Sequence, residues 1–240
     1  TRISTFFGSI VMSVETGGSG GGNVVLKAGD TTGEAKNGGS VLLSSGTALA
    51  EGGVGGEIKI LAGTGGQLTG GSITLSSGGS SAAMSGDFTI KTSDSSTDNS
   101  GKINLSTGAA ASGASGSLEL KTGSSGSATS GSVSISIGNS QTGVGGDISI
   151  HAGASATQKG GSVLVAAGGS ESKVGGSVLL STGAAGALGS SGEIKLQSGD
   201  ATSQNSGVVS IVTGSSNIGA SGSISMVVGS SSAGEAGDVT

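Results

Sequence analysis

Few side chains in this sequence offer acid–base, nucleophilic or metal-binding chemistry. His151 is the only histidine of the 240 residues, and there is no cysteine. A catalytic or metal-ligating histidine needs other ionisable or ligating side chains close to it. No such cluster accompanies His151 in the sequence. We therefore interpret His151 as a surface residue rather than as a general base or a metal ligand.

Five carboxylates share an equivalent place in a repeated pattern and are the candidates for calcium ligands. They are Asp87, Asp147, Asp238, Glu57 and Glu193. They stand at least two repeats apart along the chain, so they would not meet in a stack of repeats. The calcium-binding repeat G-G-x-G-x-D-x-U-x is also absent. We predict no metal and no cofactor.

The abundant serines do not indicate a nucleophile. They recur periodically near turns, whereas a Ser-His-Asp triad or a pair of catalytic carboxylates converges in a cleft. The glycine-rich run at 17–22 looks like a phosphate-binding loop, but it lacks the G-K-[ST] ending and no helix is predicted after it. We therefore predict that the chain is not an enzyme.

Composition excludes several other classes of protein. The chain has 53 glycines and no Pro, Cys, Trp or Tyr. Collagen needs Gly at every third residue and abundant Pro, and a flexible linker does not require regularly placed Val, Ile and Leu. The net charge of −5 comes from singly scattered residues, which argues against a nucleic-acid partner. No apolar run reaches the 18 residues of a membrane span.

The dominant feature is an internal repeat of mostly 15 residues. The segments Gly71-Ser-Ile-Thr-Leu-Ser-Ser-Gly78 and Gly116-Ser-Leu-Glu-Leu-Lys-Thr-Gly123 both read G-x-h-x-h-x-(small)-G, where h is apolar. We number each repeat from its leading glycine, which is position 1. These glycines stand at 22, 39, 56, 71, 86, 101, 116, 131, 146, 161, 176, 192, 207, 222 and 237. Residues that share a position number are therefore expected to have equivalent surroundings.

Apolar residues alternate with polar ones at the start of each repeat. Position 3 is always apolar, as in Ile73, Ile103 and Leu118, and so is position 5. This period of two is typical of a strand with one buried face. Position 8 is glycine except at Ser93, which we interpret as freedom to close a turn. Position 10 is always small, so we expect it to point inward, opposite the apolar pair.

These patterns predict an all-β chain, a parallel β-solenoid (flattened β-helix) of about fifteen 15-residue coils. Successive coils would pair about 4.8 Å apart. We expect one repeat domain over 1–240, with 1–9 as an irregular edge or junction and 10–240 as repeats. Extra residues at 30–37, 47–54 and 184–191 would lie in the return half. Because 237–240 begin another coil, we expect an uncapped segment of a longer array.

Two features of the outer face offer contacts to partners. Asn104 begins the only N-glycosylation sequon and is a possible glycan site. Several outward positions are apolar, either as tolerated surface residues or as a lateral interface. They are Val25, Leu42, Leu61, Leu164, Leu179, Val208, Val212 and Val227.

The repeat unit resembles that of a known group of proteins. Ser130-Gly-Ser-Val-Ser-Ile-Ser-Ile-Gly138 and Ser100-Gly-Lys-Ile-Asn-Leu-Ser-Thr-Gly108 are similar to repeats in long Gly/Ser-rich proteins of microalgae and other stramenopiles. Some of these resemble proteins of the tubular flagellar hairs, the mastigonemes. The resemblance covers residues 10–240. It implies an extracellular filament and brings no catalytic residues.

The sequence therefore favours a structural protein, a rod or filament shaft in an extracellular assembly at the cell surface or in an appendage. It would be a homo-oligomer or filament formed by end-to-end or lateral packing, with possible glycans and with no nucleic acid or membrane span. The alternative is an adhesin stalk or an ice-binding surface on the same rod. A regular outward Thr array would favour ice binding, but position 4 includes Leu164, Lys59 and Glu119.

Overall fold

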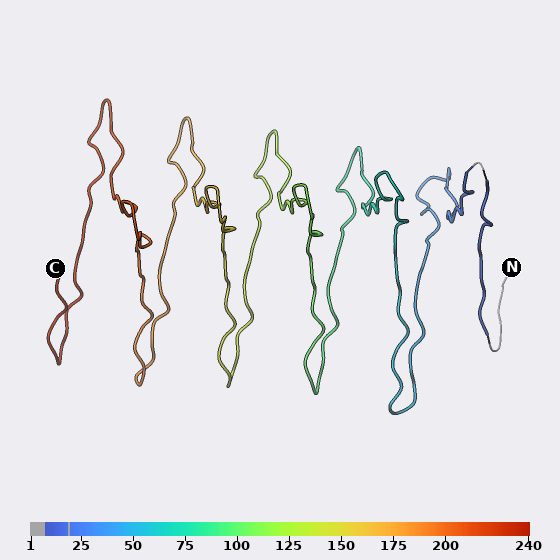
Figure 1. Ribbon diagram of the computed structural model, residues 1–240, viewed down its shortest axis with the longest axis horizontal. Coiled ribbons are helices and arrows are strands. Elements are labelled where there is room, and N and C mark those ends of the chain that lie inside the picture. Colours follow the sequence, from blue (N-terminus) through green and yellow to red (C-terminus); the bar gives the residue numbers. More distant parts are fainter. Residues whose placement is uncertain (1–7, 19) are drawn as a thin grey trace. The chain divides into compact units, whose positions relative to one another are not determined.

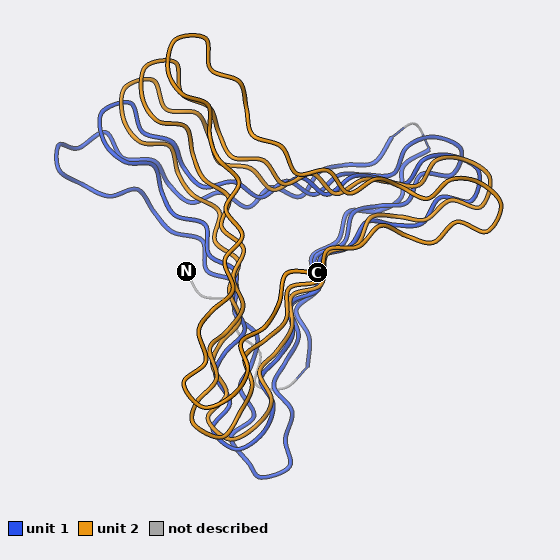
Figure 2. Cartoon of the chain, turned by 90° about the vertical axis from the view of Figure 1, so that its left-hand side faces the viewer, with its two compact units in different colours: residues 1–119 blue, residues 120–240 orange. Residues whose placement is uncertain are grey.

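The structure is a computed structural model that describes residues 8–18 and 20–240. The chain divides into two compact units, Thr1–Glu119 and Leu120–Thr240, which are coloured separately in Figure 2. In the described part of both units the chain forms neither a helix nor a strand (Figure 1). The predicted β-solenoid is therefore wrong. Seven of the nine residues predicted as an irregular edge, 1–7, lie outside the described part.

The reason for this difference lies in the backbone hydrogen bonds. A solenoid requires a ladder of N–H···O=C bonds between the extended segments of successive repeats. Here the long-range backbone bonds instead join the two ends of one loop. The leading N–H of Gly71 donates to the carbonyl of Gly63 at 2.8 Å, and that of Gly161 donates to Gly153 at 2.8 Å. Each repeat is an extended segment at positions 1–8, followed by a loop. The end of the loop returns to position 8, where the loop began.

We call the place where position 8 lies next to the following leading glycine the neck of the loop. The missing side chain of the leading glycine is what allows this approach. A Cβ built at Gly101 would lie 3.2 Å from Thr92 Cγ2, and one built at Gly161 would lie 3.2 Å from Ala152 Cβ. Both neighbours are at position 7. Packing inside the repeat therefore explains the leading glycine in these repeats, whereas at Gly116 and Gly222 the nearest atom is 3.7 Å from the added Cβ, which is an ordinary contact.

The size of position 7 correlates with whether the neck is hydrogen-bonded. Seven necks carry the bond, and their position-7 residues are Ala28, Ser45, Ala62, Ser77, Ala152, Ala167 and Thr182. The bond beside Thr182 is the longest, at 3.3 Å. Where Thr92, Thr107, Thr122, Ile137, Thr213 or Val228 stands there, the described residues form no such bond. We attribute the open necks to branched side chains that hold the two backbones apart. There are two exceptions: Ser198, whose neck is open, and Thr182, whose neck carries the longest bond.

Thr122→Ala is expected to close the neck between Gly123 and Gly131. Removing the branched side chain lets the Gly131 N–H reach the Gly123 carbonyl, as at the Ala152 neck. NMR hydrogen exchange should then show the Gly131 amide protected about three- to tenfold more, in keeping with one exposed hydrogen bond worth about 1 kcal/mol. The converse control, Ala152→Thr, should expose the Gly161 amide. Unchanged exchange in both variants would contradict the steric explanation.

The serine at position 10 closes the loop tip. Its Oγ accepts a hydrogen bond from the backbone N–H three residues later, for example from Ala128 to Ser125 at 3.1 Å and from Gly143 to Ser140 at 2.9 Å. The same contact recurs at Ser80, Ser95, Ser155, Ser170, Ser216 and Ser231. Serine hydroxyls stabilise turns in this way. The prediction that position 10 is small because it points into a core is therefore wrong.

The longer repeats contain an additional turn. In the loop that includes 30–37, Ala35 has a φ of 52°, a left-handed conformation that non-glycine residues adopt at a cost. In the loop that includes 47–54, the Gly53 N–H donates to Ala50 at 3.2 Å, and near 184–191 Gly189 donates to Gly186 at 3.2 Å. The extra residues are thus accommodated in loops and leave the extended segments unchanged.

Candidate assembly surface

The structure brings together no catalytic or metal-binding constellation in the part of the chain it describes. His151 Nε2 lies 2.6 Å from Ser149 Oγ, and both residues are exposed. No group of three or more His, Cys, Asp or Glu side chains that could hold a metal occurs over 8–18 and 20–240, nor does a pocket. The five candidate calcium ligands therefore do not form such a group. The same residues contain no helix long and apolar enough to cross a bilayer.

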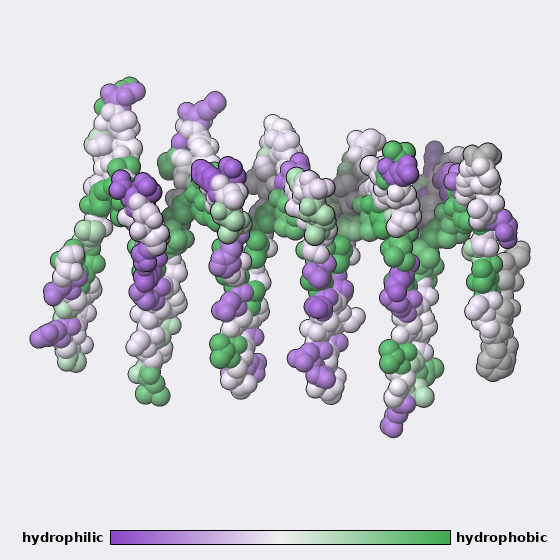
Figure 3. Space-filling model, viewed as in Figure 1, coloured by the Kyte–Doolittle hydropathy of each residue, from purple (hydrophilic) through white to green (hydrophobic). Residues whose placement is uncertain are grey.

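The apolar residues at positions 3 and 5 lie on the surface of the chain. Ile73, Ile103 and Leu118 are 52%, 53% and 61% exposed. The predicted seam buried within one chain is therefore wrong, because over residues 8–18 and 20–240 no other segment buries these side chains. The predicted alternation survives only as a difference in exposure, since Leu164 and Leu179 at position 4 are 88% and 87% exposed. Figure 3 shows apolar residues exposed among hydrophilic and intermediate ones.

The amount of exposed surface is large for the size of the chain. The accessible area is 23680 Å² for 22.0 kDa. A folded monomer of this mass exposes roughly 9,300 Å² and an unfolded chain roughly 32,000 Å². The chain therefore exposes roughly 14,000 Å² more than a self-contained domain. No residue of the described part is buried, so a large part of the hydrophobic contribution to folding is unused.

All the outward apolar residues predicted as a lateral interface are exposed. They are Val25, Leu42, Leu61, Leu164, Leu179, Val208, Val212 and Val227. Six of them occur as pairs at one position of consecutive repeats: Val25 with Leu42, Leu164 with Leu179, and Val212 with Val227. Asn104, the predicted glycan site, is exposed as well.

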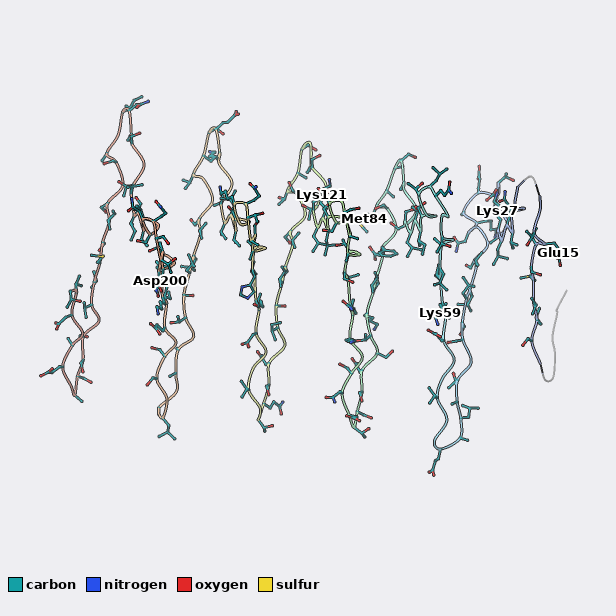
Figure 4. All side chains as sticks on the ribbon, viewed as in Figure 1. Glu15, Lys27, Lys59, Met84, Lys121 and Asp200 are labelled. Carbon is teal, nitrogen blue, oxygen red and sulfur yellow. The ribbon has the colours of Figure 1, made fainter. Side chains whose placement is uncertain are left out.

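Two exposed ion pairs contribute little to the structure of the single chain. Lys27 Nζ lies 2.7 Å from Asp30 Oδ2, and Lys59 Nζ lies 3.1 Å from Glu57 Oε2; Figure 4 labels both lysines. Each partner is well exposed, so each pair is worth at most about 1 kcal/mol. These pairs order neighbouring side chains locally and do not connect distant repeats.

Comparisons of the chain with protein-family models, curated proteins and solved structures find no match.

Proposed function

We propose that this chain is a non-enzymatic structural protein that assembles with copies of itself into a rod or filament. The single observation that carries the proposal is the exposed area, roughly 14,000 Å² above that of a folded monomer of this mass. A standard protein–protein interface buries only about 800 Å² per partner. The surface available here is many times larger, and it is repeated along the whole chain.

The chemistry of this surface suits self-association better than the capture of a ligand. Its apolar groups are aliphatic residues at fixed intervals, and its charges are single and spread along the sequence. A periodic surface is matched over its full length by another surface of the same period, which a further copy provides. The extracellular location belongs to the same proposal and is supported by the resemblance to Gly/Ser-rich filament proteins.

Electron microscopy combined with sedimentation tests this function. We expect purified chains to associate cooperatively as their concentration rises and to form elongated particles many times longer than they are wide. The sedimentation profile should shift from the 22.0 kDa species to large assemblies. A chain that stays monomeric at every concentration, or that forms only amorphous aggregates, would overturn the proposal.

A further inference from the structure

The glycine at position 8 has no explanation within the single chain. Glycine stands there in thirteen of the fourteen repeats that begin at 22–222, with Ser93 as the exception. A Cβ built on any of the thirteen would meet nothing within 4 Å. None of the thirteen has a positive φ, so the interpretation that position 8 needs unusual backbone angles is wrong. A side chain would fit there in the isolated molecule.

Position 8 differs in this respect from position 1. Every leading glycine from Gly22 to Gly237 has a neighbouring atom within 4 Å of its added Cβ. Glycine within an extended segment often marks a place where another backbone approaches closely. Since no backbone in the described part of the chain does so at position 8, the approaching backbone would belong to a second molecule.

From this we infer that a second copy of this chain lies against the extended segments, parallel to the first and displaced by one repeat, with position-8 glycines at the closest approach. This inference rests on the proposed function and specifies its interface. The apolar residues at positions 3 and 5 would then be covered by the second copy. The proposal concerns contacts between copies, not within one chain.

The lengths of the repeats favour the parallel arrangement. The repeats at 22–38 and 39–55 each have 17 residues, and they are consecutive. With parallel copies displaced by one repeat, the long loop of 22–38 in one copy lies beside the long loop of 39–55 in the next, while 39–55 of the first copy lies beside the 15-residue repeat 56–70. Antiparallel copies would set these loops against the common 15-residue repeats elsewhere in the chain.

The charges favour the displacement. Without it, every charged residue in the extended segments would lie against its own copy, and like charges directly opposite one another are destabilising. With a displacement of one repeat, no charged residue at positions 2–7 of the repeats from 22 onward meets one of the same sign. Asp87 instead meets Lys102, and Leu164 meets Leu179, because the members of each pair share a position number.

Matched glycine variants test the close approach. Gly108→Ala with Gly123→Ala changes two position-8 residues, and Gly113→Ala with Gly126→Ala changes two loop residues; all four sites are open in the single chain. We expect the position-8 variant to need at least about tenfold higher concentration to assemble, and the loop variant to match the unchanged chain. Since alanine at a compatible φ does not destabilise a chain, equal behaviour of the two variants would overturn the inference.

Disulfide trapping tests the displacement, because the chain has no cysteine of its own. Thr74→Cys and Thr89→Cys change position 4 of consecutive repeats. Parallel neighbours about 4.8 Å apart lie within the Cα range of disulfides. Dissociated chains of the two variants, mixed and assembled, should form a covalent heterodimer, and neither variant alone should form a dimer. Dimers of one variant alone, or none in the mixture, would overturn the inference.

The two proposals fail in different ways. If the unchanged chain does not form elongated assemblies, the proposed function is wrong. If it does form them, while the two glycine variants behave alike and the cysteine mixture does not link, only the proposed interface is wrong. Circular dichroism of the dissociated variants should be the same as that of the dissociated unchanged chain, which ensures that the comparison concerns assembly.

Discussion

An Ile103→Asp variant is expected to stay monomeric at concentrations at which the unchanged chain assembles. Ile103 is half-exposed in the single chain, so the substitution should hardly alter the isolated molecule. Burial of an isoleucine between copies contributes about 1.5–3 kcal/mol, and burying a carboxylate there costs several kcal/mol more. We therefore expect the concentration required for assembly to rise by about a thousandfold or more, measured by sedimentation.

Ile218→Asp provides the matched control, because Ile218 lies in a loop and its side chain is fully exposed. The same chemical change there should leave assembly within about twofold of the unchanged chain. If both variants assemble normally, the apolar residues at position 3 do not face another copy. If both fail equally, the added charge rather than its place would be responsible, which also contradicts the prediction.

The repeat and its alternation could be predicted from the sequence, but the partner of the alternating face could not. The periodicity at Ile73, Ile103 and Leu118 indicates that one face avoids water. It does not say whether the covering segment belongs to the same chain or to another, because a parallel neighbour displaced by 15 residues gives the same pattern in both cases. The β-solenoid placed that neighbour within one chain, and the exposure of these residues contradicts it.

The roles of the small residues were also only partly predictable. A small residue at position 10 is compatible with a crowded interior and with a turn. The hydrogen bond from the Ala128 N–H to Ser125 Oγ shows that it belongs to a turn. The signal was present, since serine rather than alanine or glycine is the commonest residue there. The contact between position 7 and the next leading glycine, such as Thr92 with Gly101, required the geometry of the neck.

Changing Leu164 and Leu179 together to lysine is expected to dissociate assemblies held by the outward apolar residues. The two leucines are almost fully exposed in the single chain, so their loss should not weaken the fold of the isolated molecule. Between copies displaced by one repeat, Leu164 of one copy meets Leu179 of the next. Two buried leucines contribute about 3–6 kcal/mol, and two opposed ammonium groups would repel one another. We expect a rise of at least about a hundredfold in the concentration required for assembly.

The control changes Thr74 and Thr89, which hold the same position in two consecutive repeats, to lysine. This variant introduces the same pair of like charges at the same spacing but removes no apolar contact. If repulsion alone acted, both double variants would raise the concentration required for assembly equally. If the leucines form the interface, the leucine variant should require a concentration at least about tenfold higher than the threonine variant. Normal assembly of the Leu164→Lys, Leu179→Lys variant would show that these leucines are surface residues, and the contact between copies would then rest on positions 3, 5 and 8 alone.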